Sequence, residues 1–318
     1  MILPTLLIII GFTSLIFGAN WLINGSTSLA KKIGMSDLAV GLTVVALGTS
    51  APELIVNILS SINGYSDIIL GTVIGSNNFN LFVIIGISGI ITPIAVKSNT
   101  AWKEIPLSLF IAVLFLLVAN DFFISSHNTF ISRIDSLILC VAFVLFLLYV
   151  FKQMKHDNSQ QPKMLRTSTL KTWMLLIAGM TGLVIGGKLV VDNSIHIASE
   201  LGLSEKIIGL TIIAAGTSLP ELVTSVLAAI KKNSDIAIGN VIGSNIFNIL
   251  LIVSVSSFIN PIEFNSHFNT EILIFIAGTA FLLLAMLTGQ RKKLDRWEAF
   301  ILLSFFITYT TFLVIEEL

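Results

Sequence analysis

The sequence contains ten apolar runs of about 20 residues each, separated by short polar segments. An α-helix needs about 20 residues to cross the roughly 30 Å hydrocarbon core of a bilayer. Charged residues make up 11% of the chain, less than half of the roughly 25% that is usual in a soluble domain. We therefore predict an all-α polytopic membrane protein with ten transmembrane helices, near residues 2–24, 38–61, 67–92, 104–121, 132–151, 172–193, 206–230, 235–259, 270–288 and 297–315.

The distribution of lysine and arginine predicts how these helices are oriented. When the loops are assigned alternately to the two membrane faces, 15 of the 18 lysine and arginine residues fall on one face. The positive-inside rule places that face in the cytoplasm, so that both termini lie outside. The first run, Met1–Phe17, lacks a basic n-region and an evident cleavage site, which favours a retained helix over a signal peptide. We expect a multi-pass protein of the plasma (inner) membrane.

A shift of 168 residues brings the two halves of the sequence into register. Identical pairs then include Gly18/Gly186, Gly48/Gly216, Pro52/Pro220, Asp67/Asp235, Gly75/Gly243 and Pro93/Pro261. Each half contains five predicted helices, and because five is odd, the second half must insert upside down relative to the first. We predict a first five-helix repeat at 1–151, a cytoplasmic linker loop at 152–171 and an inverted repeat at 172–318. This plan is typical of secondary transporters, whose sites lie near the membrane midplane at the repeat interface.

The most distinctive repeated segment places a carboxylate inside an apolar run. Residues 48–54 read Gly-Thr-Ser-Ala-Pro-Glu-Leu, and residues 216–222 read Gly-Thr-Ser-Leu-Pro-Glu-Leu. A charged side chain at the bilayer centre costs about 2.5–3.5 kcal/mol on insertion scales, so Glu53 and Glu221 are candidates for a functional site. The structural alternative is a protonated carboxyl group that is hydrogen-bonded between helices. The duplicated hydroxyl four residues earlier argues against that alternative.

Helical geometry places the oxygen-bearing side chains of each motif on one face. Thr49 and Ser50 lie four and three residues before Glu53, which is the spacing of neighbours on a helix surface. Pro52 has no N–H and its ring clashes with the carbonyl four residues earlier, so we expect the turn around 46–48 to open. The freed carbonyls would need a partner in the membrane, and a cation is one such partner. The corresponding residues of the second half are Thr217, Ser218, Glu221, Pro220 and the carbonyls of 214–216.

A second pair of motifs, at 71–80 and 239–248, is identical at eight of ten positions. Its glycines allow close approach of helices, as small residues do in membrane bundles. Each copy carries a serine and, four residues later, an asparagine, which places a hydroxyl and an amide on one helix face. These residues are Ser76 and Asn80 in the first copy and Ser244 and Asn248 in the second.

The combined site would consist of oxygen ligands only: two carboxylates, hydroxyls, amide oxygens and main-chain carbonyls. Because neither motif contains histidine or cysteine, zinc and copper are disfavoured. Calcium takes roughly 6–8 oxygen ligands, and two carboxylates balance its charge. Sodium would use the same oxygens, spread over several smaller sites. A shared site for which two cations compete is what an exchanger requires.

The duplicated GTSxPEL and GxxIGSNxFN motifs, within a ten-helix inverted repeat, resemble those of the calcium/cation antiporter superfamily, particularly prokaryotic sodium/calcium exchangers. The resemblance covers essentially the whole chain. It implies exchange of Na+ for Ca2+ by alternating access, with the first and sixth helices sliding across a fixed core. It implies no enzymatic activity and no cofactor. The partners would be the two ions and the lipid bilayer, with no nucleic acid and no obligatory protein partner.

The resemblance also implies a role for each oxygen-bearing residue of the motifs. The shared calcium and sodium ligands would be the two glutamates with the threonines beside them: Glu53, Glu221, Thr49 and Thr217. Two main-chain carbonyls and two serines would complete flanking sodium sites: Ala46, Ala214, Ser76 and Ser244. Two further serines would support the motifs, and two asparagines would line the centre: Ser50, Ser218, Asn80 and Asn248.

The sequence departs from the family pattern at two positions. Many sodium/calcium exchangers carry aspartate where this chain has Asn248, so the central cluster has two carboxylates instead of three. With fewer crowded carboxylates we expect milder inhibition by protons, and a potassium dependence that needs this carboxylate is in doubt. The second departure is Thr72, where the family usually has asparagine, as this chain does at Asn240. The sequence assigns no consequence to it.

Three other functions stay open at this point. A proton could neutralise Glu53 or Glu221 as sodium does, which would give a proton-coupled antiporter for calcium or another divalent cation. An ion channel would use the carboxylates as a selectivity ring, but repeats with proline-broken helices favour a carrier. An enzyme is the weakest option, because no nucleophile–base pair accompanies the glutamates.

Several polar residues receive a structural interpretation. For Asn77 and Asn245, a hydrogen bond between helices explains their presence at least as well as contact with an ion. Asn78 has no polar counterpart, since Ile246 occupies the corresponding position, and we interpret it as a packing residue. Cys140 is the single cysteine, which excludes an intrachain disulfide, and we expect it to be a small buried hydrophobe.

Overall fold

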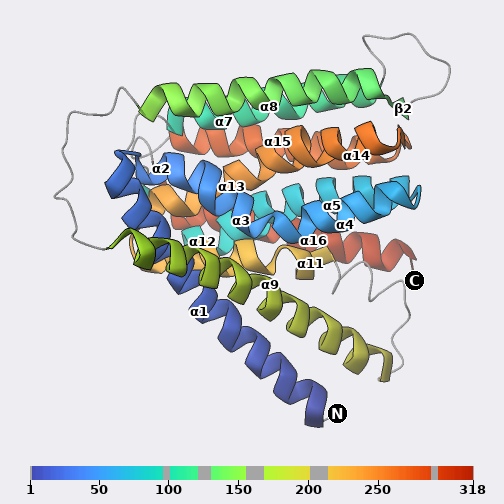
Figure 1. Cartoon of the computed structure of the whole chain (residues 1–318). Coiled ribbons are helices and arrows are strands. Elements are labelled where there is room, and N and C mark those ends of the chain that lie inside the picture. Colours follow the sequence, from blue (N-terminus) through green and yellow to red (C-terminus); the bar gives the residue numbers. More distant parts are fainter. Residues whose placement is uncertain are drawn as a thin grey trace.

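The computed structural model of the protein describes residues 2–95, 101–120, 130–154, 168–200, 214–287 and 293–317. These ranges form a layered bundle of helices, and α1 and α9 lie obliquely across it (Figure 1). The predicted all-helical architecture is confirmed. Within the described ranges, the remaining regular structure is four strands of two residues each.

The helices follow one another in the order of the predicted apolar runs. Those of the first half are α1 (Ile2–Ile33), α2 (Asp37–Val40), the π-helix η1 (Gly41–Val45), α3 (Ala46–Thr49), α4 (Ala51–Ile62), α5 (Ser66–Asn78), the π-helix η2 (Phe79–Ile84), α6 (Ile85–Ile91), α7 (Ala101–Ala119) and α8 (Arg133–Met154). Those of the second half are α9 (Thr169–Glu200), α11 (Ala214–Thr217), α12 (Leu219–Ile230), α13 (Ser234–Phe247), the π-helix η4 (Asn248–Val253), α14 (Ser254–Ile259), α15 (Phe268–Leu287) and α16 (Arg296–Glu317).

Within the described residues, each predicted run coincides with one helix or with a series of helical segments, although the first and sixth helices are longer than expected. The helix α1 continues to Ile33, and basic residues in its last turn, Lys31 and Lys32, suit the negative end of the helix dipole. Residues 206–213 of one predicted run lie outside the described residues, as do residues 155–167 of the predicted linker. By length and composition, seven of the described spans can cross a membrane, and the bent pair Asp37–Thr49 with Ala51–Ile62 would be an eighth.

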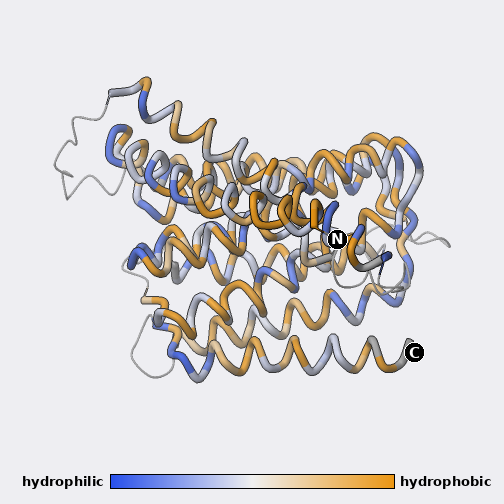
Figure 2. Tube along the Cα trace, turned by 90° about the horizontal axis from the view of Figure 1, so that it is seen from below, coloured by the Kyte–Doolittle hydropathy of each residue, from blue (hydrophilic) through white to orange (hydrophobic). Residues whose placement is uncertain are grey.

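The outer helices expose apolar side chains around the bundle, and Figure 2 shows hydrophobic positions along the whole length of the tubes. Phe17 on α1 and Phe151 on α8 are each more than half exposed. A large apolar surface of this kind fits contact with lipid. Cys140 also lies exposed on α8, so the expectation that it is buried was wrong. In a lipid-facing helix an apolar environment does not require burial within the protein.

Two short antiparallel strand pairs join distant parts of the chain. The strand β1 (Ile94–Ala95) pairs with β4 (Lys293–Leu294), and β2 (Phe130–Ile131) pairs with β3 (Ile262–Glu263). Both β1 and β3 begin directly after a proline, which cannot continue the preceding helix. These pairs hold the ends of α6 and α14 against segments far away in the sequence.

The helices α1 and α9 pack along each other through glycine residues. A Cβ atom added to Gly18 would lie 2.8 Å from the main-chain nitrogen of Leu183, and one added to Gly179 would lie 2.6 Å from that of Leu22. Only glycine permits this approach of two backbones, which is the packing that small residues allow in membrane bundles. The same pair of helices therefore forms a close, continuous contact.

Candidate functional site

The first glutamate motif lies at a break between two helices. The helix α3 ends at Thr49, α4 begins at Ala51, and the two parts of this span differ in direction by 50°. Ser50 between them has φ −85° and ψ 6°. Pro52 lies in the first turn of α4, where its missing N–H would have no partner in any case.

The opening occurs later in the chain than we expected. The carbonyl of Ala46 accepts a hydrogen bond from the N–H of Ser50 (2.9 Å). The predicted opening around 46–48 was therefore misplaced. The bond that Pro52 removes is the one to the carbonyl of Gly48, so the helix opens after that residue and not before it.

The second motif has the same local structure. The helix α11 ends at Thr217, α12 begins at Leu219, and Ser218 between them has φ −90° and ψ 7°. Pro220 again lies in the first turn of the following helix. Both halves thus place their glutamate one turn after a helix break.

The two breaks bring Glu53 and Glu221 together in the interior. Each glutamate is only 1% exposed, and their carboxyl groups are close enough to interact electrostatically. The hydroxyl of Ser50 donates to Oε1 of Glu221 (2.9 Å), which links the first motif to the second. Ser218 does not repeat this bond, since its hydroxyl donates to Oγ of Ser76 (3.2 Å). The two halves of the site are related in sequence but not identical in their hydrogen bonds.

The helix α13 reaches the site because two of its residues are glycines. Cβ atoms added to Gly239 and Gly243 would lie 2.8 Å from the carbonyl oxygen of Leu38 and 2.7 Å from that of Leu42. The expectation that the glycines of this motif permit close helix approach is confirmed for the second copy, whereas a Cβ added to Gly71 or Gly75 of the first copy would meet none of the described residues within 4 Å. Ser244 directly follows Gly243 and is fully buried.

The asparagines Asn80 and Asn248 lie where regular α-helix gives way to π-helix. The helix α5 passes into η2 at Phe79, and α13 passes into η4 at Asn248. Single turns of π-helix often occur at functional sites. The segment η4 packs against α4, which carries Glu53, and η2 packs against α12, which carries Glu221. Each asparagine therefore belongs to a π-helical segment that packs against the helix of one glutamate.

Asn240, the counterpart of Thr72, supports the site in a way that sequence reasoning missed. Its Oδ1 accepts a hydrogen bond from the hydroxyl of Thr49 (3.1 Å). Its Nδ2 donates to Oγ of Ser225 (2.9 Å) and to the main-chain oxygen of Glu221 (3.4 Å). Asn240 thus holds a candidate ligand of one half and the backbone of the glutamate in the other.

In the first half, a residue of a different helix supports the backbone of the glutamate. Asn57 occupies the position that corresponds to Ser225, and its Nδ2 donates to the main-chain oxygen of Glu53 (2.7 Å). An amide therefore supports the backbone of each glutamate, from α4 in the first half and from α13 in the second. The sequence contains a signal of this exchange. The first half combines asparagine at 57 with threonine at 72, whereas the second half combines serine at 225 with asparagine at 240, so each half has one asparagine at these two positions.

Several buried oxygen atoms of this cluster have no hydrogen-bond partner among the described residues. They are Oε2 of Glu53, Oε2 of Glu221, Oδ1 of Asn80, Oδ1 of Asn248 and Oγ of Ser244. A buried polar atom without a partner costs about 1–3 kcal/mol, and a hard cation is a partner that oxygen acceptors can share. The described residues contain no group of three or more His, Cys, Asp or Glu side chains suited to a metal ion. A cation here would depend on the amide, hydroxyl and main-chain oxygens as well as the two carboxylates.

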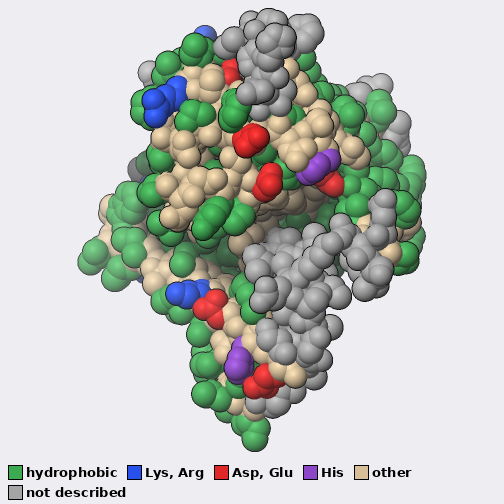
Figure 3. Space-filling view, turned by 90° about the vertical axis from the view of Figure 1, so that its right-hand side faces the viewer, with side chains coloured by type: hydrophobic (Ala, Val, Ile, Leu, Met, Phe, Trp, Pro, Cys, Tyr) green, Lys and Arg blue, Asp and Glu red, His purple; other side chains and the backbone are tan. Residues whose placement is uncertain are grey.

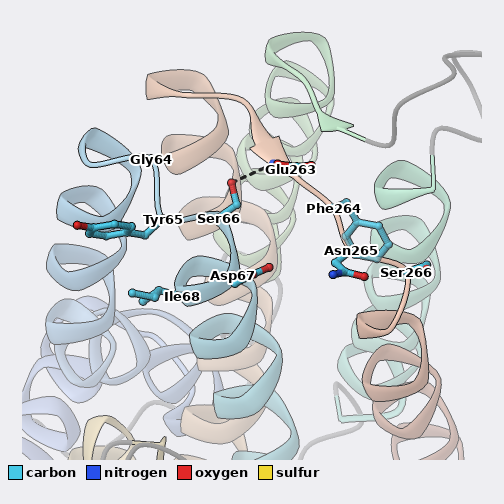
Figure 4. A pocket seen from close by; sticks show the side chains of 9 residues that line it. All are labelled: Gly64, Tyr65, Ser66, Asp67, Ile68, Glu263, Phe264, Asn265 and Ser266. Carbon is cyan, nitrogen blue, oxygen red and sulfur yellow. Dashed lines mark hydrogen bonds between the residues drawn. The ribbon is translucent and has the colours of Figure 1, made fainter. Parts of the chain in front are cut away.

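A pocket among the described residues lies elsewhere, at the far end of α4 from Glu53. It has a volume of about 650 Å³ and is lined by the segments 64–68 and 263–266. Figure 4 shows the side chains of Asp67, Glu263 and Asn265 around it, with the hydroxyl of Ser66 accepting a hydrogen bond from the N–H of Glu263 (3.0 Å). Acidic side chains also gather beside a hollow on this face of the molecule (Figure 3). This pocket is not part of the predicted site.

Comparison with known proteins gives a consistent result. The family model described as "Sodium/calcium exchanger protein" matches residues 3–152 and 171–315. The chain is 33% identical to the sodium/calcium exchanger MaX1 of Methanosarcina acetivorans, over 96% of each chain. It is 33% identical to the inner membrane protein YrbG of Escherichia coli, over 83% of this chain and 82% of that one. The solved structure of the sodium-calcium exchanger NCX_Mj, soaked with 10 mM Na+ and zero Ca2+, is similar with a TM-score of 0.84 and 30% identity, over 96% of this chain and 97% of that one.

Proposed function

This chain belongs to the sodium/calcium exchanger protein family, and we propose that it exchanges Na+ for Ca2+ across the plasma membrane. The family consists of membrane antiporters and not of enzymes, and it transports ions without a cofactor. The transported ions would meet at the cluster around Glu53 and Glu221.

The observation that carries the proposal is the set of buried, unpartnered oxygens around the two glutamates. Two carboxylates balance the charge of one calcium ion, and the amide oxygens of Asn80 and Asn248 add neutral ligands. The threonines Thr49 and Thr217 would complete the calcium site. Because burial leaves these oxygens without water, the cation itself offsets the cost of their desolvation.

Sodium would occupy smaller sites that share the same glutamates. One would combine the carbonyl of Ala46 with Ser244, because α13 packs against α3 and Gly243 lies against Ala46. The other would combine the carbonyl of Ala214 with Ser76, because Ser76 accepts a hydrogen bond from Ser218 of the second motif. Each site would also draw on the threonines and glutamates that line the calcium site: Thr49, Thr217, Glu53 and Glu221. Ser50 and Ser218 would support them from the helix breaks. Since each sodium site borrows a glutamate from the calcium site, occupancy by sodium would expel calcium, which is the basis of exchange.

We also propose that ten transmembrane helices form two inverted repeats, residues 1–151 and 172–318, joined by a cytoplasmic linker at 152–171. Both termini would lie on the extracellular side of the membrane. Alternating access would arise from movement of α1 with α9 across the rest of the bundle. The glycine contacts between these two helices support movement as a unit, because the backbones of α1 and α9 touch along their length.

The test is removal of each carboxyl charge. Glu53→Gln or Glu221→Gln should abolish sodium-driven calcium uptake, because half of the site's charge is lost while the shape is kept. The matched control is Glu104→Gln, since Glu104 is a fully buried carboxyl on α7 that accepts a hydrogen bond from Tyr149 (2.9 Å) outside the cluster. The control should retain exchange. Near-normal transport by either glutamine variant at the site would contradict the assignment.

A further inference from the structure

Asn80 and Asn248 are each hydrogen-bonded to an asparagine of the other half, in a reciprocal pattern. Nδ2 of Asn248 donates to Oδ1 of Asn77 (3.0 Å), and Nδ2 of Asn80 donates to Oδ1 of Asn245 (3.1 Å). The two bonds correspond under the 168-residue shift, which relates Asn77 to Asn245 and Asn80 to Asn248. All four side chains are buried. Water is therefore not a substitute for either bond.

The main chain sets the direction of the first bond. Nδ2 of Asn77 donates to the carbonyl oxygen of Asn245 (3.4 Å). A carbonyl accepts hydrogen bonds and cannot donate them, so the nitrogen of Asn77 must face it, and Oδ1 of Asn77 faces Asn248. That oxygen can only accept. Asn248 therefore turns its nitrogen toward Asn77 and leaves its own oxygen unpartnered.

We propose that Asn77 and Asn245 are positioning residues, which hold the amide oxygens of Asn248 and Asn80 toward the cation. The inference rests on the proposed cation site. An amide offers an oxygen on one side and an N–H on the other, and the N–H would repel a cation. A carboxylate offers oxygen on both sides. Because this chain has asparagine at 248, the orientation of the amide decides whether that position binds a cation.

The test is a double-mutant cycle on the full-length protein in proteoliposomes, read as the calcium concentration that half-saturates sodium-driven uptake. Asn77→Leu removes the acceptor with little change in volume. It should raise the half-saturating concentration about 10- to 100-fold, the usual effect of losing a residue that orients a metal ligand. In an Asn248→Asp background the same substitution should leave that concentration unchanged. Equal losses in both backgrounds, or no loss in either, would overturn the proposal, because a packing role does not depend on residue 248.

A second cycle and a control keep the test decisive. Asn245→Leu, alone and with Asn80→Asp, repeats the comparison in the other half, so the question is still answered where Asn77→Leu does not fold. The control is Asn78→Ile. Nδ2 of Asn78 donates to Glu271 (3.3 Å to Oε2), and the corresponding position 246 is already isoleucine. This variant should leave the half-saturating concentration unchanged, and a rise equal to that of Asn77→Leu would contradict a specific role for Asn77.

The same variants can be compared without measuring transport. The measured quantity is then the rise in unfolding temperature that calcium causes for each purified protein in detergent. This reading separates the inference from the proposed function. If the wild type shows no sodium-driven uptake but the cycle holds for calcium-dependent stabilisation, exchange is wrong and the positioning role stands. If the wild type exchanges ions and neither reading shows coupling between residues 77 and 248, the positioning role is wrong and the exchanger stands.

Discussion

Corresponding oxygen atoms of the proposed site have different hydrogen-bond partners in the two halves. The hydroxyl of Thr49 contacts Oδ1 of Asn240, whereas residue 72, the position that corresponds to Asn240, is a threonine with a shorter side chain. Ser50 donates to Glu221, whereas Ser218 donates to Ser76. The two proposed sodium sites are consequently unequal, although the motifs that build them are nearly the same.

The residue at 248 sets how strongly protons compete with the transported ions. Asn248→Asp would add a third carboxylate to a buried cluster in which Glu53 and Glu221 already interact. Crowded buried carboxylates favour the protonated form, so we expect uptake by this variant to fall at a higher pH than uptake by the wild type. The measurement is sodium-driven calcium uptake across a pH series. Identical pH profiles for the two proteins would count against this account of residue 248.

The proposed site lies at two helix breaks, and each break contacts a different kind of side chain on α9. A Cβ added to Gly48 would lie 2.6 Å from Cε of Met180, the end of a flexible side chain. A Cβ added to Gly216 would overlap Cγ2 of Val191, a β-branched side chain with few rotamers. Each of these glycines is the first residue of its glutamate motif, so α9 contacts both motifs close to their helix breaks.

This difference leads to a prediction about movement. Gly216→Ala should slow exchange more than Gly48→Ala, because overpacking against a stiff side chain costs about 1–3 kcal/mol and methionine can move aside. The maximal uptake rates of the two variants are to be compared at saturating calcium. Val191→Ala should restore the rate of Gly216→Ala. Equal rates for both alanine variants, or no rescue, would show that contact with α9 does not limit transport.

At this scale the sequence predicted the elements well and their details less well. Apolar length and proline placement identified the helices and the two broken spans, because both depend on local chemistry. The position of the break at Ser50, the π-helical turns at Asn80 and Asn248, and the exchange of roles between Asn57 and Asn240 were not predicted. The break at Ser50 follows from the local effect of Pro52, which we had assigned to the wrong carbonyls. The exchange of roles depends on contacts between residues that are far apart in the chain, such as Thr49 with Asn240, and no local pattern reports those contacts.

In the whole molecule, the proposed orientation follows from charge alone. The turn after α4 carries no lysine or arginine, whereas the turn after α12 carries Lys231 and Lys232. Asn63 and Lys232 are both exposed in these turns. If the positive-inside rule holds here, the two residues lie on opposite sides of the membrane.

Single cysteines test this orientation. With Cys140 replaced by alanine, Asn63→Cys should react with a membrane-impermeant maleimide on intact cells, and Lys232→Cys should react only after the membrane is opened. Both sites lie in turns outside the proposed ion site, so transport can be checked in the same variants. The opposite labelling pattern would invert the topology, and labelling of both residues on intact cells would refute a crossing between them.

We propose that sodium and calcium compete for one site around Glu53 and Glu221. The most direct measurement is calcium uptake into proteoliposomes, driven first by an outward sodium gradient and then by a proton gradient alone, at several imposed voltages. We predict uptake that requires internal sodium and is lost in Glu53→Gln and Glu221→Gln. Uptake on the proton gradient alone, with no dependence on sodium, would contradict sodium coupling and make the protein a proton-coupled antiporter.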